Sequence, residues 1–155
     1  TIFLGAMLSL LVCLMFTGCS NSETNSTSRG LTDFAHIEEE YLATIDSLNW
    51  PDGIALPDKL EDEDTGASFQ VGYGETRASY LWEYSWMKEW LDTYNTDPER
   101  AEKALEELEK AFDMPYMGID RCDDATRNYV RENIDEAKLG DPSGFTESIR
   151  ANDAN

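Results

Sequence analysis

Basic side chains are scarce in this sequence. It has 12 Lys and Arg residues against 32 Asp and Glu residues, which gives a formal net charge of −20 at pH 7. Nucleic-acid binding depends on Lys and Arg contacts with phosphates, so this balance argues against a DNA or RNA partner. It also argues against a domain that lies flat on an anionic membrane. Cations and basic peptides remain as partners, and the simplest interpretation is a charge that keeps a small domain soluble.

Motifs for catalysis and metal binding are also missing. The chain has one histidine, and no G-x-S-x-G, H-E-x-x-H or Walker sequence occurs in it. His36 lies one helical turn before Glu40, so both side chains could touch one metal ion. A di-iron bundle site requires two histidines, however, and a zinc site requires further ligands. We therefore expect no metal ion and no cofactor, and no residue can be assigned a catalytic role.

Two further segments only partly match known ligand-binding loops. The acidic run at 61–66 fits no register of a calcium loop, which requires oxygen ligands at positions 1, 3 and 5 and glycine at position 6. We interpret it as a solvated acidic loop, with divalent-cation binding as an alternative. Gly72-Tyr73-Gly74 resembles half of a phosphate loop, but Arg77 stands where the third glycine is required and Glu75 would repel a phosphate. Turn formation is the better interpretation.

Charge is absent from Thr1 to Gly18. The apolar run from Ile2 to Gly18 would extend about 26 Å as a helix, which is short of the ~30 Å hydrocarbon core of a bilayer. No basic stop-transfer residues follow it. The run is therefore typical of a signal peptide, residues 1–18, whose basic n-region we expect before Thr1.

The sequence Phe16-Thr17-Gly18-Cys19 ends this run and resembles the lipobox of bacterial lipoproteins. The resemblance implies cleavage between Gly18 and Cys19 and a diacylglycerol on the Cys19 thiol. It also implies anchoring to the outer face of the plasma membrane, or to an outer membrane if present. Phe16 departs from the leucine most common at its position. The alternatives are an ordinary secretory peptide cut near Gly18 and an uncleaved anchor.

Residues 19–30 predict a tether. Ser20 to Gly30 is rich in Ser, Asn and Thr and has no bulky apolar side chain, so it cannot pack a core. As a flexible segment it would span about 17–20 Å, roughly twice the ~8 Å Debye length at physiological salt. The acidic domain could then stay clear of the lipid charge. The sequon Asn25-Ser26-Thr27 is interpreted as coincidental in a bacterium.

The remaining sequence predicts an all-α domain at residues 31–151, followed by a tail at 152–155. Apolar residues recur at helical spacing in four segments, and a fifth, shorter helix is expected around Phe145 and Ile149. Thr96 to Glu99 offers a capping box with Pro98 in the first turn. We expect a small bundle of about four helices with one long irregular acidic loop. The four segments are 31–48, 75–94, 98–112 and 123–139.

Aromatic residues dominate the second of these helices. Trp82, Trp86, Trp90 and Tyr94 are spaced by four, and neighbouring apolar residues widen this face beyond the usual ~100° stripe. The helix should therefore be central, with these rings and Trp50 in the core. The alternatives are an open aromatic surface that grips a sugar, a peptide or a cell-wall strand, and a split in which part of the wide face stays exposed.

Cys122 would be the one free thiol of the mature chain, because Cys13 leaves with the signal peptide. Its acidic neighbours disfavour a thiolate, so we interpret it as a small buried residue. Pairing with His36 as a nucleophile is the alternative.

The mature part, with its Trp50-Pro51-Asp52-Gly53 turn and its Gly72-x-Gly-Glu segment, resembles short exported proteins of uncharacterised families, a resemblance that implies no activity. The leading hypothesis is a membrane-anchored lipoprotein whose helical module binds an envelope protein or glycan. The alternatives are a small cell-envelope glycan hydrolase with paired carboxylates and a divalent-cation-binding lipoprotein.

Overall fold

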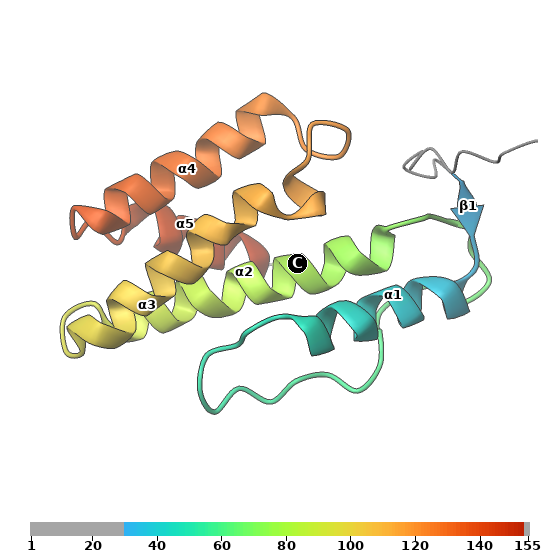
Figure 1. The fold of residues 1–155 in the computed structure, drawn as a ribbon, viewed down its shortest axis with the longest axis horizontal. Helices are drawn as coiled ribbons and strands as arrows, with labels where there is room; N and C mark the ends of the chain where they lie inside the picture. Colours follow the sequence, from blue (N-terminus) through green and yellow to red (C-terminus); the bar gives the residue numbers. More distant parts are fainter. Residues whose placement is uncertain (1–29, 154–155) are drawn as a thin grey trace, which may run out of the picture.

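The computed structural model describes residues 30–153, and this part of the chain forms a small all-α domain (Figure 1). Five α-helices account for most of it, as the periodicity predicted. Two short 3-10 helices and one two-stranded antiparallel sheet complete the described part. In chain order the elements are β1 (Leu31–Thr32), α1 (Phe34–Ser47), β2 (Phe69–Gln70), α2 (Tyr73–Thr93), α3 (Pro98–Glu109), η1 (Lys110–Asp113), η2 (Pro115–Met117), α4 (Asp124–Lys138) and α5 (Ser143–Asp153).

Helix α2 is the central element, as its wide apolar surface predicted. In Figure 1, α1 and the long loop lie along one side of it, and α3, α4 and α5 are grouped on the other. The described core accordingly has two clusters that share α2. Ile37, Tyr41, Ile45 and Leu60 pack against it from α1 and the loop. The larger cluster contains its tryptophans and the apolar faces of the three later helices.

The starts of three helices are fixed by aspartates. Asp33, Asp97 and Asp123 cap α1, α3 and α4, and the carboxylate of each accepts a hydrogen bond from the backbone N–H three residues further on. The predicted capping box from Thr96 to Glu99 is therefore wrong. Proline is well suited to the first position of a helix, and with Pro98 there the cap falls on the residue directly before it.

The long acidic loop joins α1 to α2 and is tied to both. Its Leu60 is buried under α1, and Glu63 accepts a hydrogen bond from the Tyr73 hydroxyl at 2.7 Å and pairs with Arg77 at 3.1 Å. Near its end the loop contains the two-residue strand β2, which pairs with β1 in antiparallel fashion. The loop is therefore anchored at several points although it is irregular.

None of the helices within residues 30–153 has the length and the apolar character needed to cross a bilayer.

Candidate functional site

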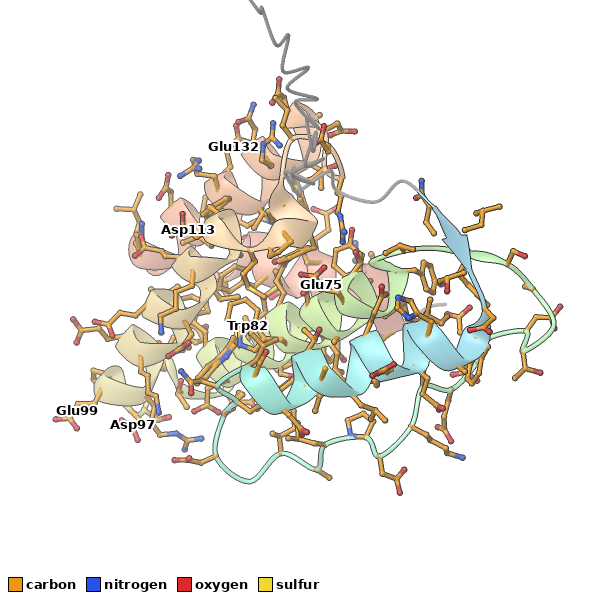
Figure 2. The ribbon with its side chains drawn as sticks, turned by 45° about the vertical axis from the view of Figure 1, so that its right-hand side comes forward. Glu75, Trp82, Asp97, Glu99, Asp113 and Glu132 are labelled. Carbon is orange, nitrogen blue, oxygen red and sulfur yellow. The ribbon has the colours of Figure 1, made fainter. Side chains whose placement is uncertain are left out.

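The tryptophans of α2 form the core of the domain. Trp82, Trp86 and Trp90 are 1%, 1% and 2% exposed. The indole N–H groups of Trp82 and Trp86 both donate to the Asn49 carbonyl oxygen, at 2.8 and 3.1 Å, so the polar edges of these rings are also satisfied. Figure 2 shows Trp82 among the helices. The alternative of an open surface built on all four rings is therefore corrected, because Trp82 and Trp86 have no exposed face for a ligand.

Trp50 connects the two clusters. It is partly buried, packs against both, and donates from Nε1 to the Ile45 carbonyl oxygen at 2.9 Å. This agrees with its interpretation as a core residue.

Tyr94 differs from the tryptophans because it lies half-buried at the end of α2. It stacks on Trp90 with ring centroids 4.6 Å apart and an interplanar angle of 19°. Both rings line an open groove of about 450 Å³ between the end of α2, the outer face of α3 and the end of α4. We call it the α3–α4 groove; it is lined by Trp90, Tyr94, Pro98, Ala101, Glu102, Leu105, Glu106, Glu109, Ala137, Lys138 and Gly140.

The rim of the α3–α4 groove is acidic. Glu102, Glu106 and Glu109 are exposed along α3. The single lining cation, Lys138, is held by Glu109 at 2.5 Å and by Asp135 at 3.1 Å. Within the described part of the chain, Glu102 and Glu106 form no ion pair. Their two negative charges therefore remain uncompensated beside an apolar floor.

The glycines at the start of α2 form a binding site that is filled by a side chain of the same chain. The Glu40 carboxylate accepts hydrogen bonds from the N–H groups of Gly72, at 2.7 Å, and Gly74, at 3.2 Å. Backbone N–H groups at a helix N-terminus favour an anion, and here that anion is a side chain of α1. Gly72 has a φ of 88°, which favours glycine, and this agrees with the turn interpretation. The role of Glu40 was missed, because nothing local in the sequence pairs it with a segment more than 30 residues away.

The residues considered for metal binding do not assemble into a site. His36 Nε2 lies 3.3 Å from Glu40 Oε1, but Glu40 is already engaged by the glycines. In the acidic loop, Glu61 pairs with Lys59 at 2.7 Å and Glu63 is held by Tyr73 and Arg77. Residues 30–153 contain no group of three or more His, Cys, Asp or Glu side chains placed to hold one metal ion.

Glu83 and Glu107 are the buried acidic side chains within residues 30–153, and Glu107 pairs with Lys110 at 2.7 Å. Glu83 is 8% exposed, and its carboxyl group accepts a hydrogen bond of 2.5 Å from the Tyr116 hydroxyl. Burial raises the pKa of Glu83, an effect that the hydrogen bond from Tyr116 partly opposes. Sequence reasoning overlooked this residue. Its burial was indicated by its spacing in the sequence. Glu83 lies three residues before Trp86 and seven before Trp90, so it is on the same face of the helix as these buried rings.

Replacing Glu83 with glutamine should change how stability depends on pH. The raised pKa means that the folded state keeps a proton that the unfolded state loses near the ordinary value of 4.5. The contribution of Glu83 to the free energy of unfolding is therefore fully present below pH 4.5, and it is lost as the pH rises through the folded-state pKa. Urea unfolding from pH 4 to pH 8 should show Glu83→Gln gaining on the wild type with rising pH, by at most about 1.4 kcal/mol per pH unit.

The comparison with Glu83→Gln isolates this carboxyl because both proteins share every other acidic residue. The other titratable groups that interact with Glu83 are Tyr80, Tyr116 and Cys122, and burial raises the pKa of all three. They therefore stay neutral through most of this range. Parallel stability curves for the two proteins would show that Glu83 does not titrate abnormally.

Cys122 is buried at 9% exposure and is the free thiol of the described part. Its Sγ lies 3.6 Å from Met117 Sδ and 3.6 Å from the Asp123 carbonyl oxygen. Burial raises the pKa of the thiol, although the nearby Arg127 opposes this. A raised pKa disfavours a thiolate, so the structure supports the interpretation as a buried residue over a Cys122–His36 nucleophile.

The predicted lipidation residue Cys19 and the cleavage flank Gly18 lie outside the described residues. Comparisons with protein families, with curated proteins and with solved structures each gave no significant match. The α3–α4 groove is a candidate binding site within residues 30–153.

Proposed function

We propose that this protein is a bacterial lipoprotein whose acidic helical domain binds a partner at the surface of a membrane. Cys19 carries the diacylglycerol, and the chain is anchored to the outer face of the plasma membrane or, if one is present, to the outer membrane. The observation that carries the proposal is Phe16-Thr17-Gly18-Cys19 at the junction of an uncharged apolar run and a polar segment. An acylated cysteine gives durable attachment when two chains are present, whereas a single chain holds only marginally.

The domain contributes two features that suit a binding module. Its two apolar clusters draw on all five helices and on Leu60 of the long loop, so its acidic surface is carried on a packed scaffold. Its α3–α4 groove combines apolar and acidic lining residues, which is the composition that a partner of opposite charge can recognise. Glu83, whose pKa is raised by burial, lies in the interior and does not line the groove. The residues that do line the groove therefore support binding.

Replacing Cys19 with alanine should move the leader-free protein out of the membrane fraction. Without the thiol no diacylglycerol can be attached, so the chain from which the leader has been removed should be soluble, whereas any uncleaved precursor keeps its apolar leader and stays with the membrane. The measurement is the distribution of the full-length chain between membrane and soluble fractions of a bacterial host after a carbonate wash. Mass spectrometry of the wild-type N-terminal peptide should show an acylated Cys19.

Cys13→Ala is the matched control, because it makes the same change within the apolar run that the proposal assigns to the leader. It should leave both acylation and membrane fractionation unchanged. An unmodified Cys19 in the purified wild type, or equal membrane fractions for wild type and Cys19→Ala with the leader removed, would contradict the lipid anchor.

A further inference from the structure

We infer that the α3–α4 groove is a docking site for a basic amphipathic helix, which places its apolar face on the groove floor and its Lys or Arg side chains against Glu102 and Glu106. The occupant is a segment of another protein, and its being an envelope protein rests on the proposed function. The inference depends on an apolar floor, an acidic rim without compensating charge and the spacing of that rim.

The floor offers apolar contact at a fixed position. Tyr94 stacks on Trp90, and Trp90 is held from behind by Phe145 in an edge-to-face contact with centroids 5.3 Å apart. Tyr94 and Leu105 are half-buried and supply the accessible apolar contact, whereas Trp90, Ala101 and Ala137 also line the groove but are buried. An aromatic ring already fixed by packing binds with little loss of side-chain entropy.

The negative charge of the rim favours a positively charged partner. Lys138 is engaged by two carboxylates, and Glu102 and Glu106 form no ion pair within residues 30–153. An acidic or phosphate-bearing ligand would be repelled, and the net charge of −20 would oppose its approach from a distance. A basic partner gains both long-range attraction and local ion pairs.

The spacing of the rim favours a helix as the occupant. Glu102, Glu106 and Glu109 are separated by four and three residues and therefore follow one face of α3 over about 10 Å of its axis. Basic residues at i and i+4 of a partner helix would face them in register, with apolar residues between them directed at the floor. This is the helix-in-groove mode of recognition.

The test uses the full mature chain reconstituted in phosphatidylcholine nanodiscs, with empty nanodiscs as the blank. Three fluorescent 15-residue synthetic peptides are titrated by anisotropy. One has a Lys/Leu amphipathic helical pattern, one replaces each Lys with Glu, and one keeps the Lys residues but replaces each Leu with Ser. The Lys/Leu peptide alone should bind saturably above the blank, because only it carries both features that the groove requires.

Two double variants then test whether the peptide binds at the α3–α4 groove. Glu102→Gln with Glu106→Gln should weaken the Lys/Leu peptide by about tenfold, since both ion pairs are lost. The control is Glu132→Gln with Glu136→Gln, which removes the same charge from two exposed glutamates four residues apart on α4, outside the groove. The control should change the affinity by less than about twofold.

Three results would overturn the inference. Equal weakening by the two double variants would show attraction to the overall charge. Equal binding of the Lys/Ser peptide would show that the apolar floor contributes nothing. Absence of saturable binding by the Lys/Leu peptide would show that the groove takes no such helix. None of these outcomes bears on acylation of Cys19, so the lipid anchor stands or fails by its own fractionation experiment.

Discussion

Replacing Trp82 with alanine should destabilise the domain by about 3–5 kcal/mol and lower its melting temperature by roughly 10–20 °C. The ring is 1% exposed at the centre of the larger core cluster, so its removal leaves a cavity that the surrounding helices can only partly fill. The Nε1 hydrogen bond to the Asn49 carbonyl oxygen is lost as well. A loss of this size is a large share of the 5–15 kcal/mol that stabilises a typical domain.

Trp82→Phe separates the two contributions. Phenylalanine keeps most of the buried ring but cannot donate to Asn49, whose carbonyl oxygen still accepts from Trp86. Trp82→Phe should therefore lower the free energy of unfolding by about 1–2 kcal/mol. Urea unfolding followed by far-ultraviolet circular dichroism measures both variants. A cost below about 1 kcal/mol for Trp82→Ala would be incompatible with a core position for this ring.

Replacing Gly74 with alanine should be comparably damaging, at about 3 kcal/mol or more, although it adds only one methyl group. A Cβ atom at this position would lie 1.8 Å from the Ile37 carbonyl oxygen and 2.9 Å from the Tyr41 nitrogen, both of which belong to the backbone of α1. Backbone atoms cannot rotate away, so α1 and α2 must separate. The separation would also lengthen the hydrogen bonds from Gly72 and Gly74 to Glu40.

Gly66→Ala is the matched control for this substitution. A Cβ atom there would have an ordinary contact of 3.4 Å with Asp64 Oδ1, and its backbone does not require a positive φ. Its stability should stay within about 0.5 kcal/mol of the wild type, because the exposed loop accommodates the methyl group. The melting temperatures of both variants, measured by thermal unfolding, test this difference in stability. Similar melting temperatures for Gly74→Ala and Gly66→Ala would mean that α1 and α2 are not in such close contact.

The helices were predictable because their signals are local. Asp33 and Asp123 stand before runs of apolar residues at helical spacing, and the structure places caps at both. The error at the third helix was also local, since Thr96 and Asp97 are both good caps and only the backbone geometry at Pro98 distinguishes them. The burial of the tryptophans followed from the same periodicity.

The contacts of Glu40, Glu83 and the groove could not be predicted in this way. Glu40 binds glycines 32 and 34 residues further along the chain, and Tyr116 is 33 residues from Glu83. The α3–α4 groove is formed by residues from three helices, among them Tyr94, Leu105 and Lys138. No local pattern encodes which helix lies beside which.

The sequence by itself determined the helical class, the central position of the tryptophan helix, the acidic surface and the resemblance of residues 16–19 to a lipobox. These are properties of spacing and composition, which act over a few residues. The tertiary structure alone decided that Tyr94 stays half-exposed in the lining of a groove while Trp82, Trp86 and Trp90 are buried. The physical reason is that the exposure of a side chain depends on the packing of the neighbouring helices, and that packing is set by contacts distant in sequence.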